Sequence, residues 1–115
     1  IAQCAAADNG GGIFGDSAFI ALKDNATVQN CSAHDDGGAI YADAGSDVTL
    51  AGASRIAQCA AADNGGGIFG DSAFIALKDN ATVQNCSAHD DGGAIYADAG
   101  SDVTLAGASR IAQCA

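Results

Sequence analysis

Residues 1–55 and 56–110 of this chain are identical at every position, and residues 111–115 begin a third copy. Each copy contains a second, weaker repeat, because the stretch 10–16 (GGGIFGD) corresponds to the stretch 37–43 (GGAIYAD). The repeating unit is therefore 27 residues followed by 28, four times over. Repeats of about 20–50 residues are typical of solenoids and propellers, in which each unit covers the apolar side of its neighbour. We therefore expect residues 1–115 to form a single repeat segment.

The hydrophobic pattern within one unit predicts three short strands separated by three bends. Residues 19–23 and 47–51 alternate apolar and polar side chains, as half-buried strands do. Residues 27–31 and 55–59 are expected to form a second strand, and a third follows the Gly-Gly pair through Ile40 and Tyr41. Residues 32–36 are expected to form a loop, and the run Ala5-Ala6-Ala7 is too short for a helix. The pattern predicts an all-β fold, a parallel β-helix (β-solenoid) of about four rungs of 27–28 residues.

Stacking of the rungs at about 4.8 Å would align equivalent side chains in columns. Four columns are entirely aliphatic and are expected to fill the interior: Ile1/Val28/Ile56/Val83/Ile111, Ile13/Ile40/Ile68/Ile95, Ile20/Val48/Ile75/Val103 and Leu22/Leu50/Leu77/Leu105. A further column, Phe14/Tyr41/Phe69/Tyr96, is aromatic and is expected on the outside. We interpret it as stacking between rungs. A platform for a carbohydrate or a protein partner is the alternative.

The charge of the chain is strongly acidic. Its 14 acidic residues are all Asp, and with only 4 Lys and Arg the net charge is −10. Such a surface makes nucleic acid a poor partner. No apolar run approaches the roughly 20 residues that a membrane-spanning helix needs, so we expect no membrane span in this segment.

Two columns consist of aspartates alone: Asp8, Asp35, Asp63 and Asp90 form one, and Asp16, Asp43, Asp71 and Asp98 form the other. Like charges at rung spacing repel by about 1 kcal/mol per pair in water. Ca²⁺ bound to these oxygens would remove the repulsion, so the eight aspartates are candidate Ca²⁺ ligands. No other cofactor is expected. The favoured alternative is that loops spread the carboxylates into solvent, where salt screens them.

Five cysteines also align in one column: Cys4, Cys31, Cys59, Cys86 and Cys114. We interpret it as a structural ladder of buried, reduced thiols. Bridges between Cys4 and Cys31 and between Cys59 and Cys86 are the alternative, since the rung spacing lies within the Cα–Cα range of disulfides. Zinc is not expected, because a straight ladder does not offer four ligands around one point.

No catalytic residue is predicted. Paired carboxylates are the machinery of glycosidases, but every candidate pair here recurs 55 residues later, whereas an active site needs a unique arrangement. His34 and His89 are expected in loops with no Ser or Cys nucleophile beside them. We therefore predict that the chain is not an enzyme.

The sequences GGAI at 37–40 and 92–95 and GGGI at 10–13 and 65–68 resemble the GGA(I/L/V) motif of chlamydial-type polymorphic outer-membrane proteins. Related repeats occur in bacterial surface adhesins. The Phe-x-x-Asn motif of that family is matched here by Val28-x-x-Cys31 and Ile1-x-x-Cys4, with an aliphatic residue in place of Phe and Cys in place of Asn. The resemblance covers the whole chain. It implies a right-handed parallel β-helix in a secreted or surface-displayed segment that takes part in adhesion.

We therefore expect a structural, non-catalytic segment of a long extracellular fibre or surface adhesin stalk, self-assembling or part of a much longer tandem array. The expected partners are copies of the same chain, end to end or side by side, and the surface of a host or neighbouring cell. The expected location is extracellular or on the cell surface. An adhesive module that binds a carbohydrate or a partner is one alternative, and a designed consensus solenoid is another.

Overall fold

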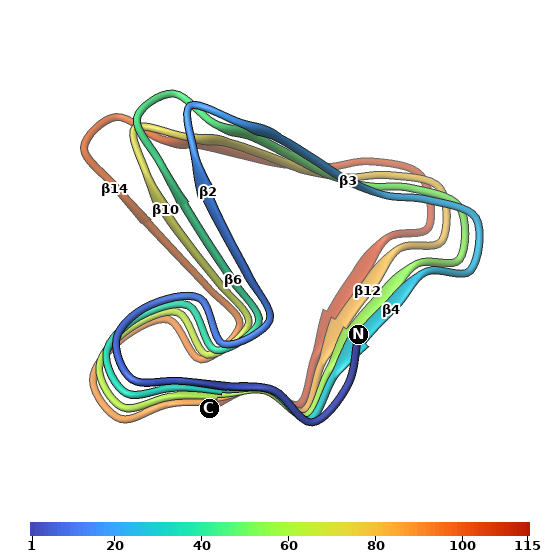
Figure 1. Ribbon diagram of the computed structural model, residues 1–115. Coiled ribbons are helices and arrows are strands. Elements are labelled where there is room, and N and C mark those ends of the chain that lie inside the picture. The colour runs from blue at the N-terminus through green and yellow to red at the C-terminus, as the bar shows by residue number, and fades with distance from the viewer.

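The computed structural model describes residues 1–115 and contains sixteen β-strands and no helix (Figure 1). Accordingly, it offers no helix of the length and apolarity needed to cross a membrane. The chain winds through four rungs that lie one behind another in Figure 1, and each rung contributes four strands. The molecule measures 32 × 26 × 21 Å along its principal axes.

The strands recur in the same order in every rung. The first rung contains β1 (Ala5–Ala6), β2 (Ile13–Asp16), β3 (Phe19–Leu22) and β4 (Thr27–Gln29). The second contains β5 (Ser32–Ala33), β6 (Ile40–Asp43), β7 (Asp47–Leu50) and β8 (Arg55–Ala57). The third contains β9 (Ala60–Ala61), β10 (Ile68–Asp71), β11 (Phe74–Leu77) and β12 (Thr82–Gln84). The fourth contains β13 (Ser87–Ala88), β14 (Ile95–Asp98), β15 (Asp102–Leu105) and β16 (Arg110–Ala112).

Equivalent strands of successive rungs form four parallel sheets. We name each sheet after its first strand: the β1 sheet (β1-β5-β9-β13), the β2 sheet (β2-β6-β10-β14), the β3 sheet (β3-β7-β11-β15) and the β4 sheet (β4-β8-β12-β16). The pairing is parallel throughout and joins the residues that the repeat aligns, for example Ile20 with Val48 and Val48 with Ile75. The predicted parallel β-solenoid of about four rungs is therefore confirmed.

The β1 sheet is a correction to the sequence analysis, which placed only a loop at residues 32–36. Ser32 and Ala33 form strand β5, and their main chain is tied to both neighbouring rungs: Ser32 N donates to Cys4 O at 2.9 Å, and Ala62 N donates to Ala33 O at 3.2 Å. Alanine and serine carry no apolar alternation, so the hydrophobic pattern could not reveal a strand held by backbone bonds alone.

The aliphatic columns fill the interior, as predicted. A cluster of 19 buried residues runs along the solenoid and includes Ile40, Val48, Leu50 and Ile56, each with 0% of its surface exposed. Burial of one such side chain is worth about 1.5–3 kcal/mol. Each rung alone would leave these side chains in water, so the fold is stable only as a stack.

The Gly-Gly pair makes the sharp bend that precedes the β2 sheet. Gly37 has a φ of +69°, which side chains rarely adopt. At Gly38 a Cβ atom would lie 2.2 Å from the carbonyl oxygen of Gly66 in the next rung. The first glycine therefore supplies the turn, and the second allows the main chains of neighbouring rungs to touch.

Candidate functional site

The outer face of the β2 sheet carries a continuous stack of four aromatic rings. The ring centroids of Phe14 and Tyr41, and of Tyr41 and Phe69, are 5.0 Å apart, and those of Phe69 and Tyr96 are 5.2 Å apart. The interplanar angles are 10°, 1° and 12° in the same order. The predicted stacking between rungs is therefore present in the structure.

The stack limits what this face can bind. Carbohydrate sites present the flat face of an aromatic ring, but here each inner ring has neighbours on both faces. Phe69 is 7% exposed, whereas Phe14, at the end of the stack, is 57% exposed. Burial, followed by the charges of Asp43, Asp71 and Asp36, raises the pKa of the Tyr41 hydroxyl. The inner rings thus serve the stack, and only ring edges and the end ring are open to a ligand.

One predicted carboxylate column lies on the same outer face, two residues further along each strand. Asp16 pairs in register with Asp43, and Asp71 with Asp98. Asp43 Oδ1 accepts a hydrogen bond from Ala44 N, and Asp98 Oδ1 accepts one from Ala99 N at 2.8 Å. These carboxylates therefore bind the turn that follows their own strand.

Beside this column, buried Ser46 ties the corner of one rung to the next. Its Oγ donates to Asp43 O at 2.6 Å and accepts from Ala18 N at 3.0 Å. Ser101 repeats both contacts, with Asp98 O at 2.6 Å and Ala73 N at 2.9 Å.

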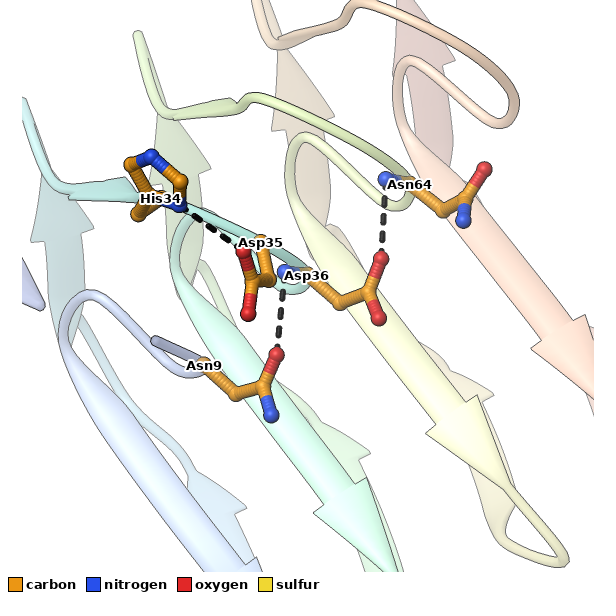
Figure 2. Close-up of polar contacts among 5 residues, drawn as sticks. All are labelled: Asn9, His34, Asp35, Asp36 and Asn64. Carbon is orange, nitrogen blue, oxygen red and sulfur yellow. Dashed lines mark hydrogen bonds and ion pairs between the residues drawn. The ribbon is translucent and has the colours of Figure 1, made fainter. Parts of the chain in front are cut away.

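The second carboxylate column lies in the loop that follows the β1 sheet. The main chain connects its members, since Asp35 N donates to Asp8 O and Asp63 N donates to Asp35 O. In this loop His34 Nδ1 lies 2.8 Å from Asp35 Oδ1 (Figure 2), and His89 and Asp90 repeat the pair at the same distance. The hydrogen bond to Asp35 raises the pKa of His34, with smaller contributions from the charges of Asp35, Asp63 and Asp8.

A ladder of side chains that the sequence pattern did not predict lies immediately before the Gly-Gly pairs. Asn9 Oδ1 accepts from Asp36 N at 3.0 Å, Asp36 Oδ1 from Asn64 N at 2.9 Å, and Asn64 Oδ1 from Asp91 N at 3.1 Å. Figure 2 shows two of these bonds crossing from one rung to the next. The residue before Gly-Gly is Asn or Asp in every rung, and this was the signal that could have revealed the ladder.

The alternation of Asn and Asp gives the ladder an electrostatic advantage. Either side chain supplies the oxygen that the next N–H needs. Only every second member is charged, so Asp36 and Asp91 are two rungs apart. At about 9.6 Å, roughly one Debye length at physiological salt, their repulsion is largely screened.

The eight aspartates proposed as Ca²⁺ ligands are not drawn together into a metal centre. No group of three or more His, Cys, Asp or Glu side chains lies close enough to hold an ion. Asp43 and Asp98 point one oxygen at the backbone, whereas Asp35 and Asp90 point one at a histidine. Binding of Ca²⁺ stays a prediction, and it would require movement of these side chains.

A comparison with protein families decides the classification of the fold. Residues 12–111 match the family described as "Right handed beta helix region". The chain belongs to this right-handed β-helix family. No curated protein and no solved structure matches the chain. The predicted right-handed β-helix repeat is thereby confirmed.

The cysteine ladder lies inside the β-helix. Cys31, Cys59 and Cys86 are each 1% exposed, Cys4 and Cys114 at the ends are partly buried, and all five are free. The Cys59 and Cys86 thiols lie 3.3 Å from the carbonyl oxygens of Ala57 and Gln84, two residues back. Burial raises the pKa of Cys31, and a hydrogen bond with the Cys59 thiol together with burial raises that of Cys86. The hydrogen bond with the Cys86 thiol lowers the pKa of Cys59 to about 7. All three thiols are nevertheless closed off from solvent, so the ladder is suited to filling the core and not to nucleophilic chemistry.

The residues that precede the cysteines make the bend of the β-helix after the β4 sheet. Gln3, Asn30, Gln58, Asn85 and Gln113 all have positive φ, between 52° and 56°. Asparagine tolerates this conformation better than most residues. Their side chains are exposed, and the hydrogen bonds between rungs at this position come from the main chain, as from Asn30 N to Ala57 O at 3.1 Å.

Proposed function

We propose that this β-helix is a structural repeat segment of a long extracellular fibre or of the stalk of a surface adhesin, without a catalytic role. The observation that carries the proposal is the junction between the two identical copies. Strand β7, in the first copy, pairs with β3 of its own copy and with β11 of the next in the same parallel register. A junction that cannot be distinguished from the interior allows the array to be lengthened without a change of fold.

The hydrogen bonding of the rungs suits a mechanical role. Every sheet continues through all four rungs, so main-chain bonds run parallel to the long axis of an extended array. The aromatic stack, the Asn/Asp ladder and the bonds from Ala18 N to Ser46 and from Ala73 N to Ser101 add side-chain contacts in the same direction. Because every junction between interior rungs carries the same bonds, no interior rung is a weak point.

Two features of the sequence support an exterior location. The Gly-Gly-Ala-Ile motif resembles motifs of bacterial surface proteins, and the charge of −10 over two copies gives about −5 per copy. This charge grows with length and keeps long fibres in solution.

The repetition also supports a non-catalytic role. Each His–Asp pair is exposed and recurs in both copies, and neither has a Ser or Cys nucleophile bonded to it. Use of the aromatic stack as an adhesive platform is less well supported, since its inner ring faces contact one another.

The proposal is tested by expressing arrays of one, two, four and eight 55-residue copies and imaging them by electron microscopy. We expect unbranched rods whose length increases by about 10 Å per copy, because each copy adds two rungs of about 4.8 Å. Compact particles, or lengths unrelated to copy number, would contradict the fibre function. Cleavage of a polysaccharide panel by the 115-residue chain would contradict the non-catalytic role.

A further inference from the structure

The outer face of the β3 sheet exposes two phenylalanines. Phe19 is 87% exposed and Phe74 is 55% exposed, although burial of a phenylalanine is worth about 1.5–3 kcal/mol. The sheet forms one complete side of the cross-section, and no other segment packs against its outer face (Figure 1). The face is therefore available to a partner.

The outward side chains of this sheet form three columns. One edge alternates phenylalanine and aspartate: Phe19, Asp47, Phe74 and Asp102. The middle column contains only small residues: Ala21, Thr49, Ala76 and Thr104. The other edge alternates lysine and alanine at positions 23, 51, 78 and 106, directly after the strands. The face thus has short side chains along its middle, aromatic and acidic side chains on one edge, and basic side chains on the other.

The lysines on this face have no partner within the chain. The only ion pairs in the structure join His34 to Asp35 and His89 to Asp90. Lys23 and Lys78 are exposed and form no ion pair, in a chain with 14 aspartates. Both lysines therefore remain free to bind acidic or aromatic groups of another molecule.

We propose that two copies of this β-helix pair side by side through the outer faces of their β3 sheets, with parallel long axes and antiparallel strands. A two-fold axis along the middle column would bring the Phe/Asp edge of each copy onto the Lys/Ala edge of the other. Phe19 would then lie over the partner's Lys23, with Asp47 one rung away. The inference rests on the proposed fibre function and names the surface through which fibres associate.

The charge pattern selects this orientation over the other face-to-face arrangement. With parallel strands, the two Lys/Ala edges would meet each other and so would the two Phe/Asp edges, so no ammonium group would lie near a carboxylate of the other copy and like charges would share an edge. With antiparallel strands each ammonium group meets an aromatic ring and a carboxylate of the other copy, and both contacts are favourable. The Ala/Thr column lets the two sheets approach to about the 10 Å typical of packed sheets.

The size of the face sets the length at which pairing becomes stable. Five residues of about 3.3 Å by two rungs of about 4.8 Å give about 160 Å² per 55-residue copy. A stable interface needs about 800 Å² on each partner, which corresponds to about five or six copies. The 115-residue chain should therefore pair only weakly, and longer arrays should pair firmly.

The first experiment uses dilution NMR on the 115-residue chain at millimolar to micromolar concentration. We expect signals of Phe19, Phe74, Lys23 and Lys78 to shift with concentration, while those of the aromatic stack do not. Concentration-independent spectra, or shifts on another face, would overturn the proposal.

The second experiment compares two variants that carry the same change in charge. Lys23→Ala with Lys78→Ala places on this edge the residue that alternate rungs already hold there, Ala51 and Ala106. The control is Arg55→Thr with Arg110→Thr. It removes two positive charges from the β4 sheet and leaves there the residue that alternate rungs already hold, Thr27 and Thr82. We expect the lysine variant to weaken pairing about tenfold or more, and the arginine control to pair as the parent does. Equal effects would attribute the association to net charge and contradict the proposal.

A third experiment in six-copy arrays separates this inference from the fibre function. Lys→Asp at the Lys23 position and Asp→Lys at the Asp47 position of every copy should each abolish pairing, and mixing the two arrays should restore it. Rods that remain one solenoid wide under all conditions would overturn the pairing but leave the fibre function intact.

Discussion

At the scale of single residues, the two kinds of rung fill the same space in different ways. In the first and third rungs a glycine lies against an isoleucine. In the second and fourth rungs alanine takes the place of the glycine and valine the place of the isoleucine. A Cβ atom on Gly70 would lie 2.8 Å from Cδ1 of Ile75, and one on Gly15 would lie 2.6 Å from Cδ1 of Ile20. One methyl group has thus moved from one side chain to its neighbour, and the core volume is preserved.

This exchange predicts a rescue between two substitutions. Gly70→Ala alone should lower the free energy of unfolding by about 1–3 kcal/mol through overpacking. Ile75→Val alone should lower it by about 0.5–1.5 kcal/mol through the cavity it leaves. Urea denaturation should show that the double variant, which copies the Ala42 and Val48 arrangement, is more stable than Gly70→Ala. A double variant less stable than either single one would contradict this account.

Ser54 carries a buried hydroxyl that the fold does not satisfy. It is 0% exposed, and its Oγ has no hydrogen-bond partner. Its neighbours in the adjoining rungs are Ala26 and Ala81. Because an unpaired buried hydroxyl costs about 1–3 kcal/mol, Ser54→Ala should raise the free energy of unfolding by about 1 kcal/mol. Ser46→Ala is the contrasting variant, since its hydroxyl is bonded; it should be destabilising, and the reverse order would contradict the assignment.

His34 should report the acidic loop through its titration. Its pKa is raised mainly by the hydrogen bond to Asp35, with smaller effects from the charges of Asp35, Asp63 and Asp8. Since the folded pKa exceeds the unfolded one, its contribution to stability is present in full below the unfolded pKa. That contribution is lost as pH rises through the folded pKa.

NMR titration in a His89→Asn background, where one histidine remains, measures this pKa directly. Asp35→Asn should lower it clearly, and Asp63→Asn should lower it less. A pKa unaffected by Asp35→Asn would show that the pair does not form in solution.

At the scale of elements, the side-chain ladders act together with the short strands. Strands such as β5, with two residues, are held by main-chain bonds to both neighbouring rungs, and the loop that follows them is fixed by the Asn/Asp ladder. The ladder has an accepting oxygen at each step and a charge at every second step. Its order therefore matters as much as its composition.

Substitution in the ladder separates the hydrogen bond from the charge. Asp36→Asn keeps the acceptor for Asn64 N and removes a charge, so the stability should be equal or higher. Asn64→Asp keeps the acceptor for Asp91 N but places carboxylates in three successive rungs, so it should be destabilising. Thermal unfolding should show that high salt recovers part of this loss. A loss independent of salt would exclude repulsion as its cause.

At the scale of the whole molecule, stability is distributed unevenly along the solenoid. Val48 and Leu50 in the second rung are 0% exposed, while their counterparts Val103 and Leu105 in the last rung are 40% and 47% exposed. The two segments have the same sequence, so the difference arises only from the missing neighbour.

Hydrogen exchange should reveal this gradient. Amides of β15 should exchange much faster than those of β7, although their intrinsic rates are equal because the peptides are identical. NMR with isotope labelling confined to one copy distinguishes them. Addition of a third 55-residue copy should slow exchange in β15 to the rate of β7. Equal exchange rates of β7 and β15 in the 115-residue chain itself would contradict rung-by-rung stabilisation.

The sequence predicted those parts of the molecule that depend on periodicity. The 27- and 28-residue unit and the aliphatic columns were sufficient for the parallel β-solenoid, its register and its core. The β5 strand and the Asn9–Asp36 contact were missed, because they depend on backbone bonds and on small or polar residues without an apolar pattern. The aspartate columns were found, but sequence alone could not show that Asp43 binds its own turn, since that depends on the local backbone.

The alternating ladder before the Gly-Gly pairs has a consequence for how genes of this kind can change. Loss or gain of 55 residues by recombination leaves Asn and Asp alternating from rung to rung. Excision of the single unit 56–82 would instead place Asp36 and Asp91 in neighbouring rungs, where their carboxylates would repel each other. Variation in fibre length should therefore occur in steps of two units, and internal deletions of a single unit should be rare.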